Sequence, residues 1–152
     1  MNLKTYEKID IASQMLDTAL SLFMEKKDYF SVLQIAGACD EILGKHLKLK
    51  GIETSLETQV TALHSIKKSL SGVDSPLKRI RDELLNKAKN SIKHMNNANE
   101  RHIDMDPKFE AEEMLDRVIM NWWKLKGDSK PLIHKYFDFQ SKQLSTNEDC
   151  SL

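Results

Sequence analysis

Apolar residues recur at intervals of three and four along most of this chain, which is the period of one face of an α-helix. Only five glycines and three prolines occur among the 152 residues, and most fall between the periodic segments, where they predict helix ends. No stretch alternates apolar and polar residues over a useful length for a strand. The sequence therefore predicts an all-α fold, an antiparallel helical bundle of about five main helices plus a short C-terminal helix.

Local signals set the expected bounds of these helices. Thr54 followed by Glu57 has the spacing of a capping box, and Pro76 and Pro107 are typical of the start of a helix. Gly127 favours a helix end. The segments expected to be helical are residues 3–24, 29–50, 54–70, 77–95 and 107–126, with a short one at 131–139.

The length of the chain predicts one domain of ordinary size, spanning residues 1–139. Residues 140–152 are polar and are predicted to form a flexible tail. Hydrophobic residues make up 40% of the chain and charged residues 30%, a composition that supports a real core and excludes a disordered chain.

The charges exclude a global attraction to nucleic acid. Lysine and arginine total 23, aspartate and glutamate also total 23, so any site for a polyanion must be local. The two cysteines, Cys39 and Cys150, provide neither a disulfide framework nor a zinc site, which favours a reducing cytoplasm. The N-terminal residues are charged and no window approaches about 18 apolar residues, so we expect no export and no membrane insertion.

Several suggestive patterns have simpler interpretations. Gly37 and Gly44 are separated by six residues where a phosphate-binding loop needs four, so small residues for close helix packing are the better interpretation. The five histidines show no pair at ligand spacing with a carboxylate, and we predict neither a metal nor a cofactor.

Of the adjacent Trp122 and Trp123, only one can fill the core. The basic residues Lys67, Lys68, Lys78, Arg79 and Arg81 are more typical of a solvated face than of a binding patch.

One segment carries a functional hypothesis. Lys89, Asn90 and His94 concentrate a cation, an amide and an imidazole at the end of a predicted helix. This layout resembles the HEPN superfamily, the all-α domain named for higher eukaryotes and prokaryotes nucleotide-binding, whose signature is an arginine, a polar residue and, a few positions on, a histidine. Residues 36–45 and 106–113 also resemble HEPN sequences, and the likeness covers roughly residues 3–127 in helix order. Lysine stands here at position 89 where the family has arginine.

The resemblance implies a dimer in which two copies of the motif meet across the interface. Active members are metal-independent ribonucleases, in which the ribose 2′-hydroxyl attacks the neighbouring phosphorus. In that chemistry His94 would transfer a proton, Lys89 would stabilise charge on the phosphorus, and Asn90 would hold a phosphate oxygen or the imidazole. Lys93, Arg101 and His102 are candidates for further phosphate contacts. Some HEPN domains also pair with a nucleotidyltransferase chain, which is a possible partner here.

Geometry limits the catalytic hypothesis. Five residues of regular helix leave Lys89 and His94 about 140° apart, so they converge only if the helix breaks or a second protomer contributes. Lysine also lacks the planar fork with which arginine binds two phosphate oxygens. We therefore predict a dimeric module for binding RNA, a nucleotide or a partner protein, with weak or lost catalysis. An active endoribonuclease, a small-ligand pocket and a plain helical scaffold are the alternatives.

Overall fold

The computed structural model describes residues 3–95 and 98–148, and these residues form helices joined by short links, with no β-strand among them. The predicted all-α class is therefore confirmed for the described part of the chain. The elements are α1 (Lys8–Met24), α2 (Tyr29–Leu49), α3 (Ser55–Ser71), α4 (Leu77–Ile80), the π-helical turn η1 (Arg81–Leu85), α5 (Lys87–Ser91), the 3-10 turn η2 (Ala98–Arg101), α6 (Pro107–Lys126) and α7 (Pro131–Glu148).

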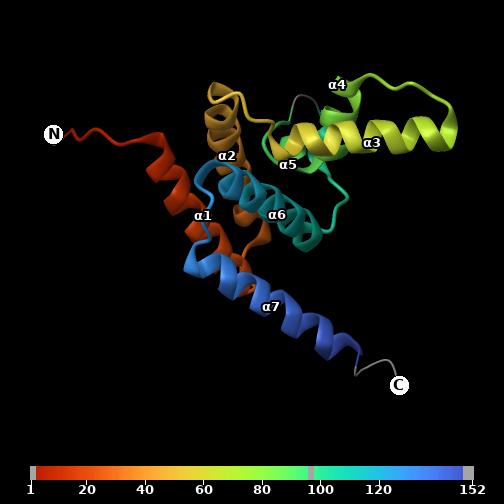
Figure 1. Ribbon diagram of the computed structural model, residues 1–152. Coiled ribbons are helices and arrows are strands. Elements are labelled where there is room, and N and C mark those ends of the chain that lie inside the picture. The colour runs from red at the N-terminus through yellow and green to blue at the C-terminus, as the bar shows by residue number, and fades with distance from the viewer. Residues whose placement is uncertain (1–2, 96–97, 149–152) are drawn as a thin grey trace.

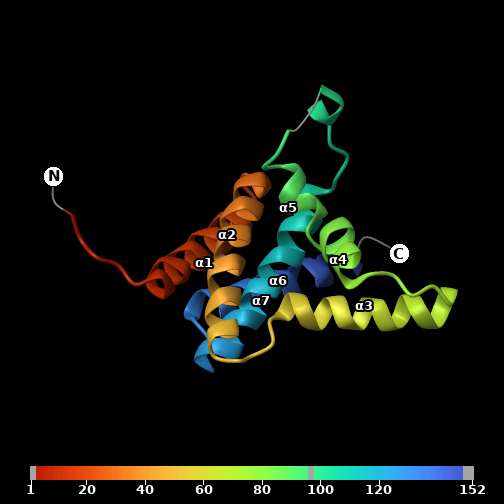
Figure 2. The ribbon, with the colours of Figure 1, turned by 90° about the horizontal axis from the view of Figure 1, so that it is seen from above.

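Helix α2 lies at the centre of the fold, because its two most extensive contacts are with α1 and α6. Helix α7 packs against α1, and together these four helices surround the core (Figure 1). Helix α3 contacts α6 and α4 near its start, and its far half projects away from the other helices (Figure 2). The main hydrophobic core accordingly contains no residue of α3.

The local signals for helix ends are confirmed. The Thr54 hydroxyl accepts a hydrogen bond from the Glu57 backbone N–H (3.2 Å), and the Glu57 carboxylate accepts one from the Thr54 N–H (3.0 Å). At the start of α6, the Asp106 carboxylate accepts from the N–H groups of Lys108 (3.0 Å) and Phe109 (3.1 Å). These bonds satisfy backbone donors that a helix leaves unpaired at its first turn.

The prediction of one continuous helix over residues 77–95 is wrong. The segment is divided into α4, η1 and α5, and Asn86 leaves helical geometry at φ −113° and ψ 3°. The buried side chain of Asn86 accepts a hydrogen bond from Arg117 of α6, so a contact with a distant helix fixes this break. Helix α1 also begins later than predicted, at Lys8 rather than Leu3, because the residues before Lys8 are exposed and have no core to pack on.

Helix α7 is longer than predicted, since it continues past Phe139 to Glu148. Two polar contacts hold this extension to α6: Gln140 donates to Glu112 (2.7 Å), and Lys108 donates to Gln143 (3.0 Å). The first nine residues of the predicted tail are therefore helical. Residues 149–152 of that tail, including Cys150, lie outside the described residues.

Phe23 joins α1 to α7 at the base of the core. Its ring makes edge contacts with Tyr29, Tyr136 and Phe139 at centroid distances of 5.4, 5.5 and 6.3 Å, and the side chain is 1% exposed. We expect Phe23→Ala to lower the free energy of unfolding by about 3–5 kcal/mol, because it leaves a cavity among these rings. Urea denaturation measures the change. Leu49→Ala at the exposed end of α2 is the control and should cost less than about 0.5 kcal/mol.

The contact between α7 and α6 includes a titrating carboxyl group. The Tyr136 hydroxyl donates to Asp116 Oδ1 (3.1 Å) and accepts from Gln140 Nε2 (2.8 Å). Burial raises the pKa of Asp116 to about 6; the Tyr136 bond opposes this rise, and Glu112 and Glu113 add to it. The folded state thus binds this proton more tightly than the unfolded chain, and the contribution of Asp116 to stability falls as the pH rises through about 6.

We expect Asp116→Asn to remove that dependence, because the amide keeps an acceptor for Tyr136 and carries no charge. The free energy of unfolding of the variant, relative to that of the parent chain, should increase by on the order of 1 kcal/mol as the pH rises from about 4 to about 7. This figure allows for the partial exposure of Asp116. Denaturant unfolding of both chains across this pH range measures the difference. A difference that does not change with pH would contradict the assignment.

Candidate functional site

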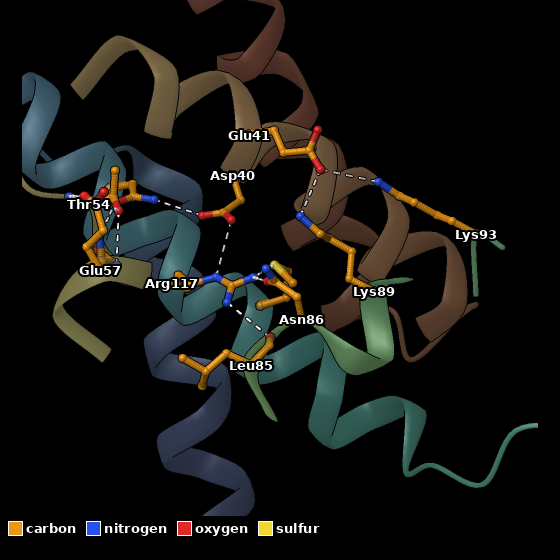
Figure 3. Close-up of polar contacts among 12 residues, drawn as sticks. Asp40, Glu41, Thr54, Glu57, Leu85, Asn86, Lys89, Lys93 and Arg117 are labelled. Atoms are coloured by element: carbon orange, nitrogen blue, oxygen red, sulfur yellow. Dashed lines mark hydrogen bonds and ion pairs between the residues drawn. The ribbon is translucent and has the colours of Figure 1, made fainter. Parts of the chain in front are cut away.

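A cluster of buried polar side chains lies where α2, α6 and the turn before α5 meet (Figure 3). Arg117 of α6 is 3% exposed, and its Nε lies 3.4 Å from Asp40 Oδ2 of α2. Asn121, one turn further along α6, donates to Asp40 Oδ1 (2.9 Å). The Arg117 Nη2 donates to Asn86 Oδ1 (3.2 Å). These bonds compensate the burial of a charged pair, which is costly when its partners are missing.

The same cluster fixes the start of α3 and the end of η1. The Asn121 side-chain oxygen accepts from the Ser55 N–H (2.8 Å), and Arg117 Nη1 donates to the Leu85 carbonyl (3.3 Å). Burial raises the pKa of Asp40, and the opposing effects of Arg117, Lys89 and the Asn121 hydrogen bond are smaller. The cluster therefore joins four segments that are far apart in the sequence.

Lys89, the predicted charge-stabilising residue, is itself buried. It is 5% exposed, and its Nζ donates to Glu41 Oε1 of α2 at 2.9 Å. Its stem lies over Gly37, where an added Cβ would come within 2.6 Å of the lysine Cδ. The close approach predicted at this glycine is therefore made by a lysine side chain from α5. The hydrogen bond from Lys89 lowers the pKa of Glu41, so this carboxylate is ionised at neutral pH.

The other two motif residues are exposed and lie apart from that ion pair. Helix α5 ends at Ser91, and the backbone N–H of His94 donates to the Asn90 carbonyl (3.1 Å). The regular helix thus ends between Lys89 and His94, while that i to i−4 bond continues the turn as far as His94. Nevertheless, no hydrogen bond or ion pair joins these two side chains within residues 3–95 and 98–148.

The predicted phosphate contacts are divided between two places. Lys93 lies beside the motif, with its Nζ 3.6 Å from the same Glu41 oxygen that Lys89 contacts (Figure 3). Arg101 and His102 are exposed residues of the link between α5 and α6. The described residues 98–106 of that link extend away from the helices (Figure 2). The structure therefore associates Lys93 with Lys89 and leaves Arg101 and His102 on a separate segment.

A polar cleft of about 380 Å³ opens beside Asn90, between α2, the start of α3 and α5. Lys48 at its edge is paired with Glu57 (2.8 Å), whereas Lys45 is exposed. The volume suits one small molecule or one nucleotide unit. Its polar lining consists of three lysines, two carboxylates, three asparagines and a threonine: Lys45, Lys48, Lys89, Asp40, Glu41, Asn86, Asn90, Asn121 and Thr54.

The partners of the motif residues were not predictable from the motif itself. Asp40 and Glu41 lie in the stretch that resembles HEPN sequences, but neither was predicted as a site residue. Arg117 and Asn121 lie on the buried side of α6. A charged or amide residue at a core-facing helical position was the available signal, because such residues are buried only when paired.

The comparisons give no family for the chain: no family model, curated protein or solved structure matches it. Within the described residues, no group of three or more histidine, cysteine, aspartate or glutamate side chains is arranged to hold a metal ion. Across the same part of the chain, every helix is too short or too polar to span a bilayer.

We expect Asp40→Ala to lower the free energy of unfolding by about 3–5 kcal/mol, because it leaves the guanidinium of Arg117 buried without its carboxylate. Asp40→Leu combined with Arg117→Met should cost less than the sum of the two single changes, since no uncompensated charge remains. Guanidinium denaturation of the parent chain, Asp40→Leu, Arg117→Met and the double variant measures the coupling free energy between the two side chains.

The matched control is Glu83→Ala, which removes an exposed ion pair with Arg79 and should change stability by less than about 1 kcal/mol. If the losses in free energy of unfolding caused by the changes at positions 40 and 117 simply add, the two side chains do not stabilise each other, and the prediction is contradicted.

Proposed function

We propose that this chain is a HEPN-like helical module of the cytoplasm, an antiparallel bundle that acts as a homodimer and binds single-stranded RNA at the end of α5. In this proposal RNA cleavage is weak or lost. The observation that carries it is the burial of Lys89 in an ion pair with Glu41, beside an exposed Lys93 and His94.

The burial and pairing of the Lys89 ammonium oppose strong catalysis. A cation that stabilises a phosphoryl transition state must face the reacting phosphate and have its charge available there. The Lys89 ammonium lies 2.9 Å from a carboxylate oxygen and is almost excluded from solvent. A single lysine also provides no bidentate hold on two phosphate oxygens. Lys89 therefore acts in this proposal as a structural residue that anchors α5 to α2.

The polar groups left at the surface near the end of α5 favour binding. Lys93 and His94 follow α5, and Asn90 and Lys45 line the adjacent cleft. Cationic and amide groups of this kind contact phosphate oxygens, which supply much of the affinity for nucleic acid. The cleft has room for one unstacked nucleotide unit but not for a duplex, which favours a single strand.

A metal-independent endoribonuclease is the second candidate. The observation that favours it is the end of α5 between Lys89 and His94, which leaves the imidazole free for a site shared by two protomers. Lys89 would have to leave Glu41 for this chemistry. The products would then end in 2′,3′-cyclic phosphate. A nucleotidyltransferase-like partner chain and a plain scaffold role stay predictions of the sequence.

The binding proposal is tested by fluorescence anisotropy with a labelled single-stranded RNA over a range of salt concentrations. We expect Lys93→Ala to weaken binding and to reduce the slope of log affinity against log salt by about 0.7, the value for one lost phosphate contact. His94→Ala should weaken binding as well. Lys135→Ala, an exposed lysine of α7, is the matched control and should leave both affinity and slope unchanged.

The same RNA, analysed for cleavage with and without a chelator, separates the two candidates. Equal affinity in the parent chain and the Lys93→Ala and His94→Ala variants would reject the binding site. Chelator-resistant cleavage that gives 2′,3′-cyclic phosphate ends and disappears in His94→Ala would instead establish the ribonuclease.

A further inference from the structure

The outer half of α3 is an exposed amphipathic arm. Only Ser55 and Val60 of this helix are buried, whereas Ile66 and Leu70 are exposed, Leu70 by 85%. The arm projects away from the other helices in both views (Figures 1 and 2). Apolar side chains on a helix in water favour a partner surface that covers them.

The arm is also positively charged. Residues 61–80, which include the outer half of α3 and α4, contain the four cations Lys67, Lys68, Lys78 and Arg79 and one acid, Asp74, so the net charge is +3. Two of these cations are paired, Lys68 with Asp74 (3.2 Å) and Arg79 with Glu83 (2.6 Å), which leaves Lys67 and Lys78. Lys67 and Lys68 are both exposed. Lys67 flanks the face of Ile66 and Leu70, whereas Lys68 lies about 160° around the helix from both. A partner surface should therefore be both apolar and acidic.

Helix α6 of the same chain offers such a surface. Phe109, Glu113, Asp116 and Met120 follow each other at spacings of four, three and four, which places them on one face of the helix. Phe109 and Met120 are exposed, and Glu113 is exposed between them. Residues 106–116 contain five acids and one lysine, a net charge of −4.

This face of α6 forms one side of a groove. Two cavities of about 110 and 300 Å³ adjoin at Gln59 and Arg117, and the first half of α3 forms the opposite side. The acids Glu110, Glu113 and Asp116 line this groove, and burial together with Glu113 and Asp106 raises the pKa of Glu110. Of the lining cations, Arg117 and Lys89 are paired with Asp40 and Glu41, and Lys124 donates to the Glu53 carbonyl and to Thr58. A cationic segment placed there would relieve the repulsion among these acids.

We propose that a second copy of this chain docks the outer half of its α3 in this groove, and that the two copies do so reciprocally. Lys67 of each arm, which flanks the face of Ile66 and Leu70, then lies against Glu113 and Glu110 of the other chain. Ile66 and Leu70 cover the exposed Phe109 and Met120. A two-fold axis makes both contacts at once, since each chain carries one arm and one groove.

The pairing rests on the homodimer of the proposed function, for which it names the interface, but it does not depend on RNA binding. The groove does border Lys89 of α5, so the second copy would lie close to the motif segment. Association is therefore measured without RNA, and its failure leaves the RNA-binding test unaffected.

Sedimentation equilibrium of charge-reversed chains tests the proposal. We expect the parent chain to be mostly dimeric at protein concentrations below about 100 µM, because a dimer with a micromolar dissociation constant is populated there. Lys67→Glu with Lys68→Glu reverses the arm, and Glu110→Lys with Glu113→Lys reverses the groove. Each double variant should be weakened in self-association by at least about tenfold, because both contacts of the symmetric dimer become repulsive. An equimolar mixture of the two should pair, since both arm and groove contacts are attractive again.

Lys8→Glu with Lys135→Glu, which changes the same charge on α1 and α7, is the matched control and should leave the dimer intact. Circular dichroism verifies that each variant is folded, and Lys67→Gln with Lys68→Gln gives a milder form of the arm change. A monomeric parent chain, a dimer unaffected by either reversal, or a mixture that does not pair would each overturn the proposal.

Discussion

The buried guanidinium of Arg117 is the constraint around which this fold is arranged. A charge at 3% exposure is tolerated only where acceptors surround it, and here they come from Asp40 of α2, from Asn86 and from the Leu85 carbonyl. To supply two of these acceptors, the chain must leave regular helix at Asn86. The break in turn places the short α5 against α2. The geometry of the motif segment therefore depends on an arginine more than twenty residues further along the chain.

The position of α5 decides what Lys89 can do. Its stem occupies the space over Gly37, and its ammonium reaches Glu41 rather than solvent. Glu41 also lies near the ammonium of Lys93, so one carboxylate serves two cations at this point. The lysine then stabilises the packing of α5, while His94, Lys93 and the polar cleft remain for a ligand. This division between a structural cation and an exposed binding edge is the physical basis for proposing binding in place of efficient cleavage.

The sequence predicted those features that depend on neighbouring residues. The capping box at Thr54, the start of α6 after Asp106 and the end of α6 at Gly127 are all local, and all are confirmed. The break at Asn86 and the extension of α7 could not be predicted in this way, because each is fixed by contacts with α6. For the same reason the sequence placed Lys89, Asn90 and His94 close together along the chain but could not show that Lys89 turns inward to Glu41, 48 residues earlier.

The most direct test observes the Lys89 ammonium itself by nuclear magnetic resonance of the lysine side-chain nitrogens, with a short single-stranded RNA added in steps. The account predicts a Lys89 Nζ–H signal that exchanges slowly with water, because the group is buried and hydrogen-bonded, and that keeps its position while the Lys93 and His94 signals shift. Rapid exchange of the Lys89 protons with water, or a shift of its signal on RNA addition as large as that of Lys93, would contradict it.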